Sequence, residues 1–160
     1  MQNQIDNSIV LLSSKIREFT KPVRKVGFIV DSELEIDYLD IVRLTENIGL
    51  KEKDLKVVSY SKTVFNDPFY KMRVSDESIN FFGNIRSADA NEFISYDYDL
   101  LINYFGKNKI LSLISSKSNA KFRVGFEKSN PKLNDIIFKN IYNNFGKFSN
   151  QLVKYLKILK

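Results

Sequence analysis

The sequence contains no cysteine, no histidine and no tryptophan. These absences exclude zinc fingers, disulfide frameworks, histidine-ligated haem, Cys–His nucleophilic pairs and Ser-His-Asp triads. An enzyme built from this chain would have to use Asp, Glu, Lys, Arg, Tyr, Ser or Thr. The lack of cysteine also fits a reducing compartment.

Long apolar runs are absent as well. No stretch approaches the roughly 20 apolar residues that a membrane-spanning helix needs. The apolar run at residues 9–12 follows Asp6 and lacks a preceding basic region, so it does not have the pattern of a signal peptide. We therefore expect a cytoplasmic protein with no transmembrane segment. A length of 160 residues, 43% of them hydrophobic, is enough for one packed domain.

Apolar segments alternate with helical patterns along most of the chain. The continuous apolar run at residues 26–30 is typical of a strand buried on both faces of a parallel sheet. By the same reasoning we expect further strands at residues 55–60, 78–82, 98–104, 122–126 and 135–138, and helices at 87–94, 109–117 and 145–159. This alternation predicts an α/β fold: a Rossmann-like, doubly wound, mostly parallel sheet of five or six strands with helices on both faces.

The helix expected after the first strand has recognisable ends. Ser32 and Glu35 have the spacing of a capping box, which predicts a helix with Ser32 as its N-cap. The apolar pattern continues to Leu44, and Gly49 stands where a left-handed residue would end the helix. From residue 61 to 75 the pattern weakens, so this segment is expected to be the longest loop.

An additional helix is expected before the first strand, over residues 4–19. Ile5, Ile9, Leu12 and Ile16 recur at three- and four-residue spacing and form one apolar stripe. We assign residues 1–22 to this amphipathic helix and residues 23–160 to a single α/β domain. The stripe is expected to pack on the sheet layer. The alternative is that it docks on a protein partner.

Charge is segregated along the chain, whose net charge is +6. Residues 105–160 hold 12 of the 25 basic residues against only Glu127 and Asp135, so this part alone carries +10. Residues 26–50 and 76–104 each carry −5. A basic surface of this kind favours an anionic partner, although lysines also serve solubility. The candidate anion or nucleic-acid contacts are Lys107, Lys109, Lys117, Lys121, Arg123, Lys128 and Lys132.

A ligand crevice is expected where the parallel strands end, because the carboxyl ends of strands line the crevice in open α/β sheets. Asp31, Ser32, Asp99 and Gly106 are the candidate crevice residues. Asp31, with Asp99 or Asp37, has the chemistry of a base or a metal ligand, and the alternative is that it caps a helix. Gly106 precedes Lys107 and an expected helix N-terminus, a place that suits an anion.

No glycine-rich phosphate loop follows the first strand, where Asp31-Ser32-Glu33 stands instead. This counts against dinucleotide binding of the usual kind and against a nucleoside triphosphatase. The sequence assigns no catalytic residue, metal site or cofactor.

Two segments carry a family resemblance. Residues 98–103, Tyr-Asp-Leu-Leu-Ile-Asn, and residues 120–126, Ala-Lys-Phe-Arg-Val-Gly-Phe, flank an expected helix. This module resembles one in heptosyltransferase-type glycosyltransferases, and the chain is also similar to a family of short, uncharacterised bacterial proteins with a single α/β domain. The resemblance covers about 30 residues well. It implies the fold, and it argues against glycosyl transfer by this chain alone, because those transferases use two such domains.

Three functions follow as hypotheses. The first is a non-catalytic binding or accessory protein whose basic surface contacts an anionic partner, with RNA or a ribonucleoprotein as the expected partner. The second is a nucleotide- or sugar-nucleotide-binding enzyme that needs a second subunit, with Asp31, Asp99 and Lys107 as its candidate residues. The third is a protein–protein interaction module that uses the N-terminal helix.

Overall fold

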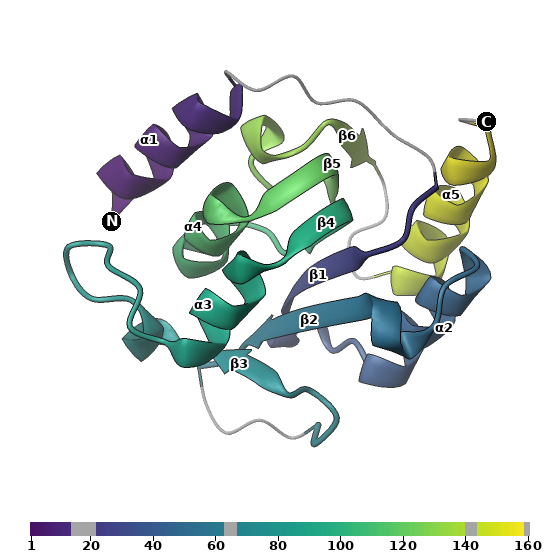
Figure 1. Ribbon diagram of the computed structural model, residues 1–160, viewed down its shortest axis with the longest axis horizontal. Helices are drawn as coiled ribbons and strands as arrows, with labels where there is room; N and C mark the ends of the chain where they lie inside the picture. Colours follow the sequence, from purple (N-terminus) through teal and green to yellow (C-terminus); the bar gives the residue numbers. More distant parts are fainter. Residues whose placement is uncertain (14–21, 63–66, 140–143, 159–160) are drawn as a thin grey trace.

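Six parallel strands form one sheet at the centre of the protein (Figure 1). The computed structural model describes residues 1–13, 22–62, 67–139 and 144–158. The strand order is β3-β2-β1-β4-β5-β6. The strands are β1 (Val26–Asp31), β2 (Leu55–Tyr60), β3 (Met72–Val74), β4 (Asp97–Tyr104), β5 (Asn119–Phe126) and β6 (Ile136–Phe138). The predicted α/β class and the mostly parallel sheet of five or six strands are therefore confirmed, and all six observed strands are parallel.

The order of the strands reverses at the middle of the sheet. From β1 the chain builds outward through β2 to β3, then crosses back to β4 and builds outward on the other side through β5 to β6. β1 and β4 are therefore neighbours, and Val30 at the end of β1 pairs with Tyr104 at the end of β4. In doubly wound sheets such a reversal is the switch point beside which ligands bind.

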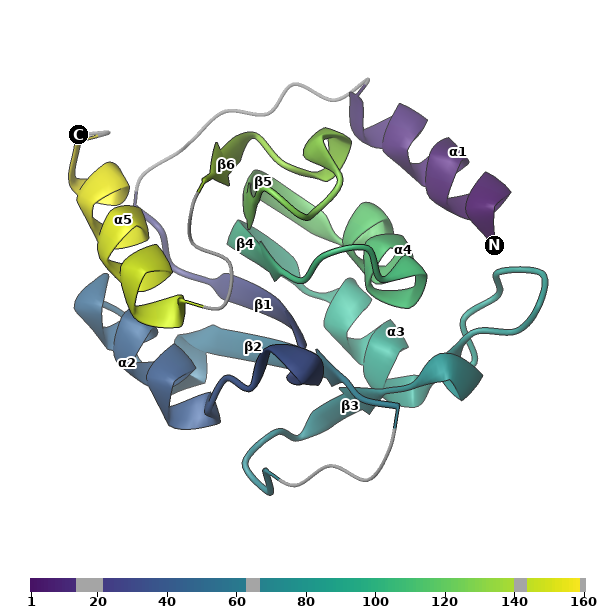
Figure 2. The same ribbon diagram turned by 180° about the vertical axis from the view of Figure 1, so that it is seen from behind.

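Helices cover both faces of the sheet (Figures 1 and 2). α2 (Tyr38–Asn47) and α5 (Phe145–Ile158) pack on one face. α3 (Ala88–Ser95) and α4 (Lys109–Lys117) pack on the other, where α1 (Gln2–Ser13) lies against α4. Alternate residues of β1 divide between the two layers: Phe28 and Val30 face α2 and α5, and Ile29 faces α4. This explains why the central strands read as continuous apolar runs.

The N-terminal helix is present and is part of the core. Ile5 and Ile9 are buried in the same cluster as the α4 side chains, so these two stripe residues pack inward as expected. Residues 14–19 of the predicted helix lie outside the described residues.

The helix after β1 does not begin where we predicted. Asp31, rather than Ser32, is the capping residue: its carboxylate accepts the backbone N–H of Glu33 and begins a short 3-10 turn, η1 (Ser32–Leu34). Glu35 then adopts a left-handed conformation with φ 51°, which ends the turn, and α2 starts at Tyr38. The predicted end is confirmed, because Gly49 has φ 90° and its N–H reaches Glu46.

The third strand was also misplaced. It occupies Met72–Val74, inside the segment expected to be a loop, and pairs with Val58–Tyr60 of β2. Of the residues predicted as a strand at 78–82, Ile79 makes only an isolated antiparallel bridge to Ile85. Three residues at the edge of a sheet bury little apolar surface, so the sequence pattern there is weak.

A buried polar cluster holds β4, β5 and α4 together. Asn103 donates to Asn134 Oδ1 at 2.8 Å and accepts from the Ser115 hydroxyl at 2.8 Å, and Asn134 donates to Ser129 Oγ at 2.9 Å. Gly125 pairs with Asn103 across the sheet, and a Cβ atom at Gly125 would collide with the Asn134 amide. The lack of a side chain at Gly125 therefore provides the space that the Asn134 amide occupies in this cluster.

We predict opposite effects for two glycine-to-alanine substitutions. Gly125→Ala displaces Asn134 and should lower the free energy of unfolding by about 1–3 kcal/mol, as overpacking does. Gly146→Ala lies in α5, where the nearest atom is 3.8 Å from the new Cβ, and should raise it by about 0.5–1 kcal/mol. Urea unfolding of both variants measures the difference. Equal effects would show that the space at Gly125 is not needed.

Candidate functional site

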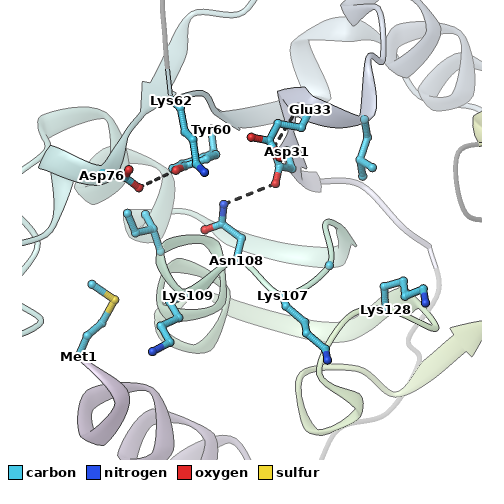
Figure 3. Close-up of a pocket in the computed structure, with 13 residues that line it drawn as sticks. Met1, Asp31, Glu33, Tyr60, Lys62, Asp76, Lys107, Asn108, Lys109 and Lys128 are labelled. Carbon is cyan, nitrogen blue, oxygen red and sulfur yellow. Dashed lines mark hydrogen bonds between the residues drawn. The ribbon is translucent and has the colours of Figure 1, made fainter.

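A cleft of about 920 Å³ lies over the carboxyl edge of the sheet, beside the switch point between β1 and β4 (Figure 3). Its walls come from the segments that follow β1, β2, β3, β4 and β5. The volume is within the range of small-molecule sites in proteins. The charged residues that line it are Asp31, Glu33, Lys62, Asp76, Lys107, Lys109 and Lys128.

Three lysines form one side of the cleft, which we call the basic wall: Lys107, Lys109 and Lys128 (Figure 3). Lys107 and Lys109 flank the start of α4, and Lys128 follows β5. Asn108 caps α4, because its side-chain oxygen accepts the N–H of Leu111 at 3.0 Å. The positive end of the α4 dipole thus points to the same space as the lysines, and both favour an anion there.

Carboxylates stand on the opposite side of the cleft, at the ends of β1 and β3. Asp31 accepts the Glu33 N–H at 3.0 Å through Oδ1, and the Asn108 amide lies 3.5 Å from its Oδ2, the outer limit of a hydrogen bond. Burial raises the pKa of Asp31 above its usual value, partly offset by these hydrogen bonds. Asp76 accepts the Tyr60 hydroxyl at 2.5 Å. Burial and this bond to Asp76 raise the pKa of Tyr60.

Five of the predicted residues meet in this cleft: Asp31, Gly106, Lys107, Lys109 and Lys128. Ser32 lies next to it, within η1. The other predicted lysines lie elsewhere: Lys117 ends α4, Lys121 is near the start of β5, and Lys132 lies in the short turn η4 (Pro131–Leu133). The seven basic candidates therefore do not gather on one surface.

Arg123 was predicted as an anion contact, but the structure buries it. Its side chain is fully buried, and its guanidinium donates to the backbone carbonyls of Ser115 and Ser118, at the end of α4. Because a group with no exposed surface is closed to a macromolecular partner, Arg123 anchors α4 to β5 instead of contacting RNA.

Asp99 does not line the cleft, although it was predicted as a crevice residue. It lies near the start of β4, at the amino edge of the sheet, and so on the opposite side from Asp31. Its Oδ2 accepts the backbone N–H groups of Arg24 and Lys25 at 2.8 and 2.9 Å, and its Oδ1 pairs with Lys121 at 3.2 Å. Burial alone would raise the pKa of Asp99, but these three donors together lower it below its usual value. Asp99 fixes the chain where it enters β1.

Several cleft residues escaped the sequence analysis: Glu33, Tyr60, Lys62, Asp76 and Asn108. Each follows or ends a parallel strand or begins the helix after one, and that is the signal that could have found them. Asp76 was missed because the third strand was placed after it, whereas β3 ends at Val74.

The aromatic side chains that interleave with the basic residues belong to the core. Tyr104, Phe105, Phe122 and Phe126 are all buried. Burial raises the pKa of Tyr104 to about 12. These four rings are therefore closed to stacking by nucleic-acid bases.

Two absences hold for the residues that the structure describes. Among them, no group of three or more His, Cys, Asp or Glu side chains is arranged to hold a metal ion. Within the same residues, every helix is too short or too polar to cross a membrane.

The fold and the cleft define a class: a doubly wound α/β protein with an open polar cleft at its switch point. Residues 1–159 match the model of a family of unknown function, DUF6913, and the chain belongs to this family. No curated protein and no solved structure matches the chain.

We predict that Asp99→Asn lowers the free energy of unfolding by about 1–3 kcal/mol at neutral pH, because charge-assisted bonds to two backbone N–H groups become weaker ones. A carboxylate whose pKa is lowered by folding stabilises the protein above its unfolded pKa, and the effect is lost as pH falls through the folded value. The difference between wild type and variant should stay constant above about pH 5 and shrink in more acidic solution.

Urea unfolding from pH 7 to pH 2 provides the measurement, and Lys121→Met is the control. The Lys121 side chain is 59% exposed, so losing its ion pair should cost less than about 1 kcal/mol. A wild-type to Asp99→Asn difference that does not change with pH would contradict the assignment.

Proposed function

We propose that this protein is a non-catalytic binding protein that takes a phosphate-bearing ligand into the cleft over β1 and β4. One observation carries the proposal: three lysines and the N-terminus of α4 border one cleft at the switch point of a parallel sheet. Each of these features favours an anion, and phosphate accepts several hydrogen bonds at once.

The lysines on the basic wall are placed for such a role. Lys107 and Lys109 are exposed, and within the described residues no carboxylate lies at ion-pair distance from either. The loop before α4 contains Gly106, where an added Cβ atom would lie 3.4 Å from the Lys128 Cβ, so this loop and the segment after β5 lie close together. The lysines come from two separate connections, β4 to α4 and the segment after β5, so a ligand between them would be held from two sides.

A small ligand agrees better with this geometry than the RNA expected from the sequence. A long polyanion needs basic residues spread over one face. Here Arg123 is buried, Lys121 is paired with Asp99, and Lys117 lies at the far end of α4 from Lys109. A sugar-nucleotide enzyme completed by a second subunit would use the same cleft, but it would need a catalytic group that we do not assign.

We predict that inorganic phosphate and nucleoside monophosphates raise the thermal stability of the protein. Ligand at 100 times its dissociation constant should add about 2.7 kcal/mol to the free energy of unfolding. The double variant Lys107→Ala/Lys109→Ala should lose tenfold or more in affinity, since hydrogen bonds to charged groups contribute about 1.5–3 kcal/mol each. Thermal-shift titration and calorimetry measure both quantities.

Lys117→Ala is the matched control, because it removes an exposed lysine from the same helix at the opposite edge. It should leave phosphate affinity unchanged. A 20-nucleotide RNA serves as the competing ligand. If RNA bound tightly and Lys117→Ala and Lys107→Ala/Lys109→Ala weakened it equally, the RNA hypothesis would replace this proposal. Absence of binding to any phosphate compound would refute the proposal.

A further inference from the structure

The two sides of the cleft carry opposite charges and come from different halves of the sheet. The basic wall belongs to β4 and β5, which lie on one side of the switch point. Asp31, Glu33 and Asp76 follow β1 and β3, on the other side, and we call these three residues the acidic wall. In Figure 3 the acidic residues lie on one side of Asn108 and the three lysines on the other, with the lysine side chains directed away from the acidic residues. Lys62, after β2, is a basic residue that also lines the cleft on the acidic side.

This arrangement is less favourable for an anion with no other functional groups than the basic wall alone would be. Lysines attract such an anion, but three carboxylates around the same cleft repel it, and the repulsion is strongest where water is partly excluded. A cleft of about 920 Å³ also leaves most of its volume empty around a single phosphate. The acidic wall becomes an advantage only if the ligand also carries hydrogen-bond donors.

The Asp31 carboxylate can accept hydrogen bonds from such donors. Its Oδ1 accepts the Glu33 N–H at 3.0 Å, whereas the hydrogen-bond partner of Oδ2 within the described part of the chain is the Asn108 amide at 3.5 Å. A carboxylate oxygen accepts more than one hydrogen bond, so Oδ2 has capacity left on the cleft side. Asp31 is also half-buried, so its charge lacks full hydration, and a ligand hydroxyl would replace the missing water.

We propose that the ligand is a phosphate monoester that carries free hydroxyl groups, of the pentose phosphate or nucleoside monophosphate class. Its phosphate lies on the basic wall, and its hydroxyls donate to the Asp31 carboxylate. The inference rests on the proposed function, since it needs phosphate binding in this cleft. It adds the hydroxyl-bearing part of the ligand.

The test compares methyl phosphate with ribose 5-phosphate. Both are phosphate monoesters, and only the sugar phosphate carries hydroxyl donors. Calorimetry with the wild-type protein should show ribose 5-phosphate binding about tenfold or more tightly, because a hydrogen bond to a charged acceptor contributes about 1.5–3 kcal/mol. AMP presents the same phosphate and two ribose hydroxyls, so tighter binding of AMP than of methyl phosphate gives the same support.

Asp31→Asn should change the two affinities in opposite directions. Methyl phosphate should bind as well or better, since a repelling charge is gone, while ribose 5-phosphate should bind more weakly. Asn keeps the side-chain oxygen that caps η1. Asp97→Asn is the charge-matched control: it lies at the start of β4, on the opposite edge, and should change neither affinity.

Each outcome bears on a separate claim. If methyl phosphate and ribose 5-phosphate bind the wild type equally well, the hydroxyl subsite is refuted while phosphate binding stands. The subsite is likewise refuted if the preference persists unchanged in a folded Asp31→Asn variant. If neither phosphate compound binds, the proposed function itself fails. The wild-type comparison decides the question even if Asp31→Asn does not fold.

Discussion

The reversal of strand order between β1 and β4 is the constraint on which the rest of the structure depends. Because β1 is followed by α2 on one face and β4 by α4 on the other, the two connections diverge from the same point of the sheet. The cleft lies between these two diverging connections. It also brings together residues that are distant in sequence: Asp31 and Asn108 are 77 positions apart, yet their side chains meet there.

The two edges of the sheet have different roles. At the amino edge Asp99 receives two backbone N–H groups and Lys121, so its charge is used to hold β1 beside β4. At the carboxyl edge, among the residues that the structure describes, no carboxylate forms an ion pair with Lys107 or Lys109. Beneath α4, Arg123 and the cluster around Asn103 fix the helix whose N-terminus borders the cleft. The cleft is therefore open, and the helix at its border is held by buried hydrogen bonds.

The sequence predicted the fold well where burial imposes a strong pattern. Strands buried on both faces, such as Val26–Asp31 and Asp97–Tyr104, and α4 were found close to their observed bounds, but the asparagine that caps α4 was not identified. The prediction was wrong where the pattern is weak or ambiguous: β3 has three residues, and Ser32 matches a capping motif that Asp31 and the left-handed Glu35 override. For the candidate site, position after a strand located Asp31 and Lys107. It could not show that Arg123 points inward or that Asp99 faces the other edge, because both depend on three-dimensional packing.

The sheet narrows from eight-residue strands at β4 and β5 to three-residue strands at both margins. Short marginal strands present few unpaired backbone groups to a neighbouring chain, and this is a known protection against strand-by-strand polymerisation. Recruitment of another polypeptide by strand addition is correspondingly disfavoured. A polypeptide partner would therefore have to be recognised by side chains rather than through the backbone of an added strand.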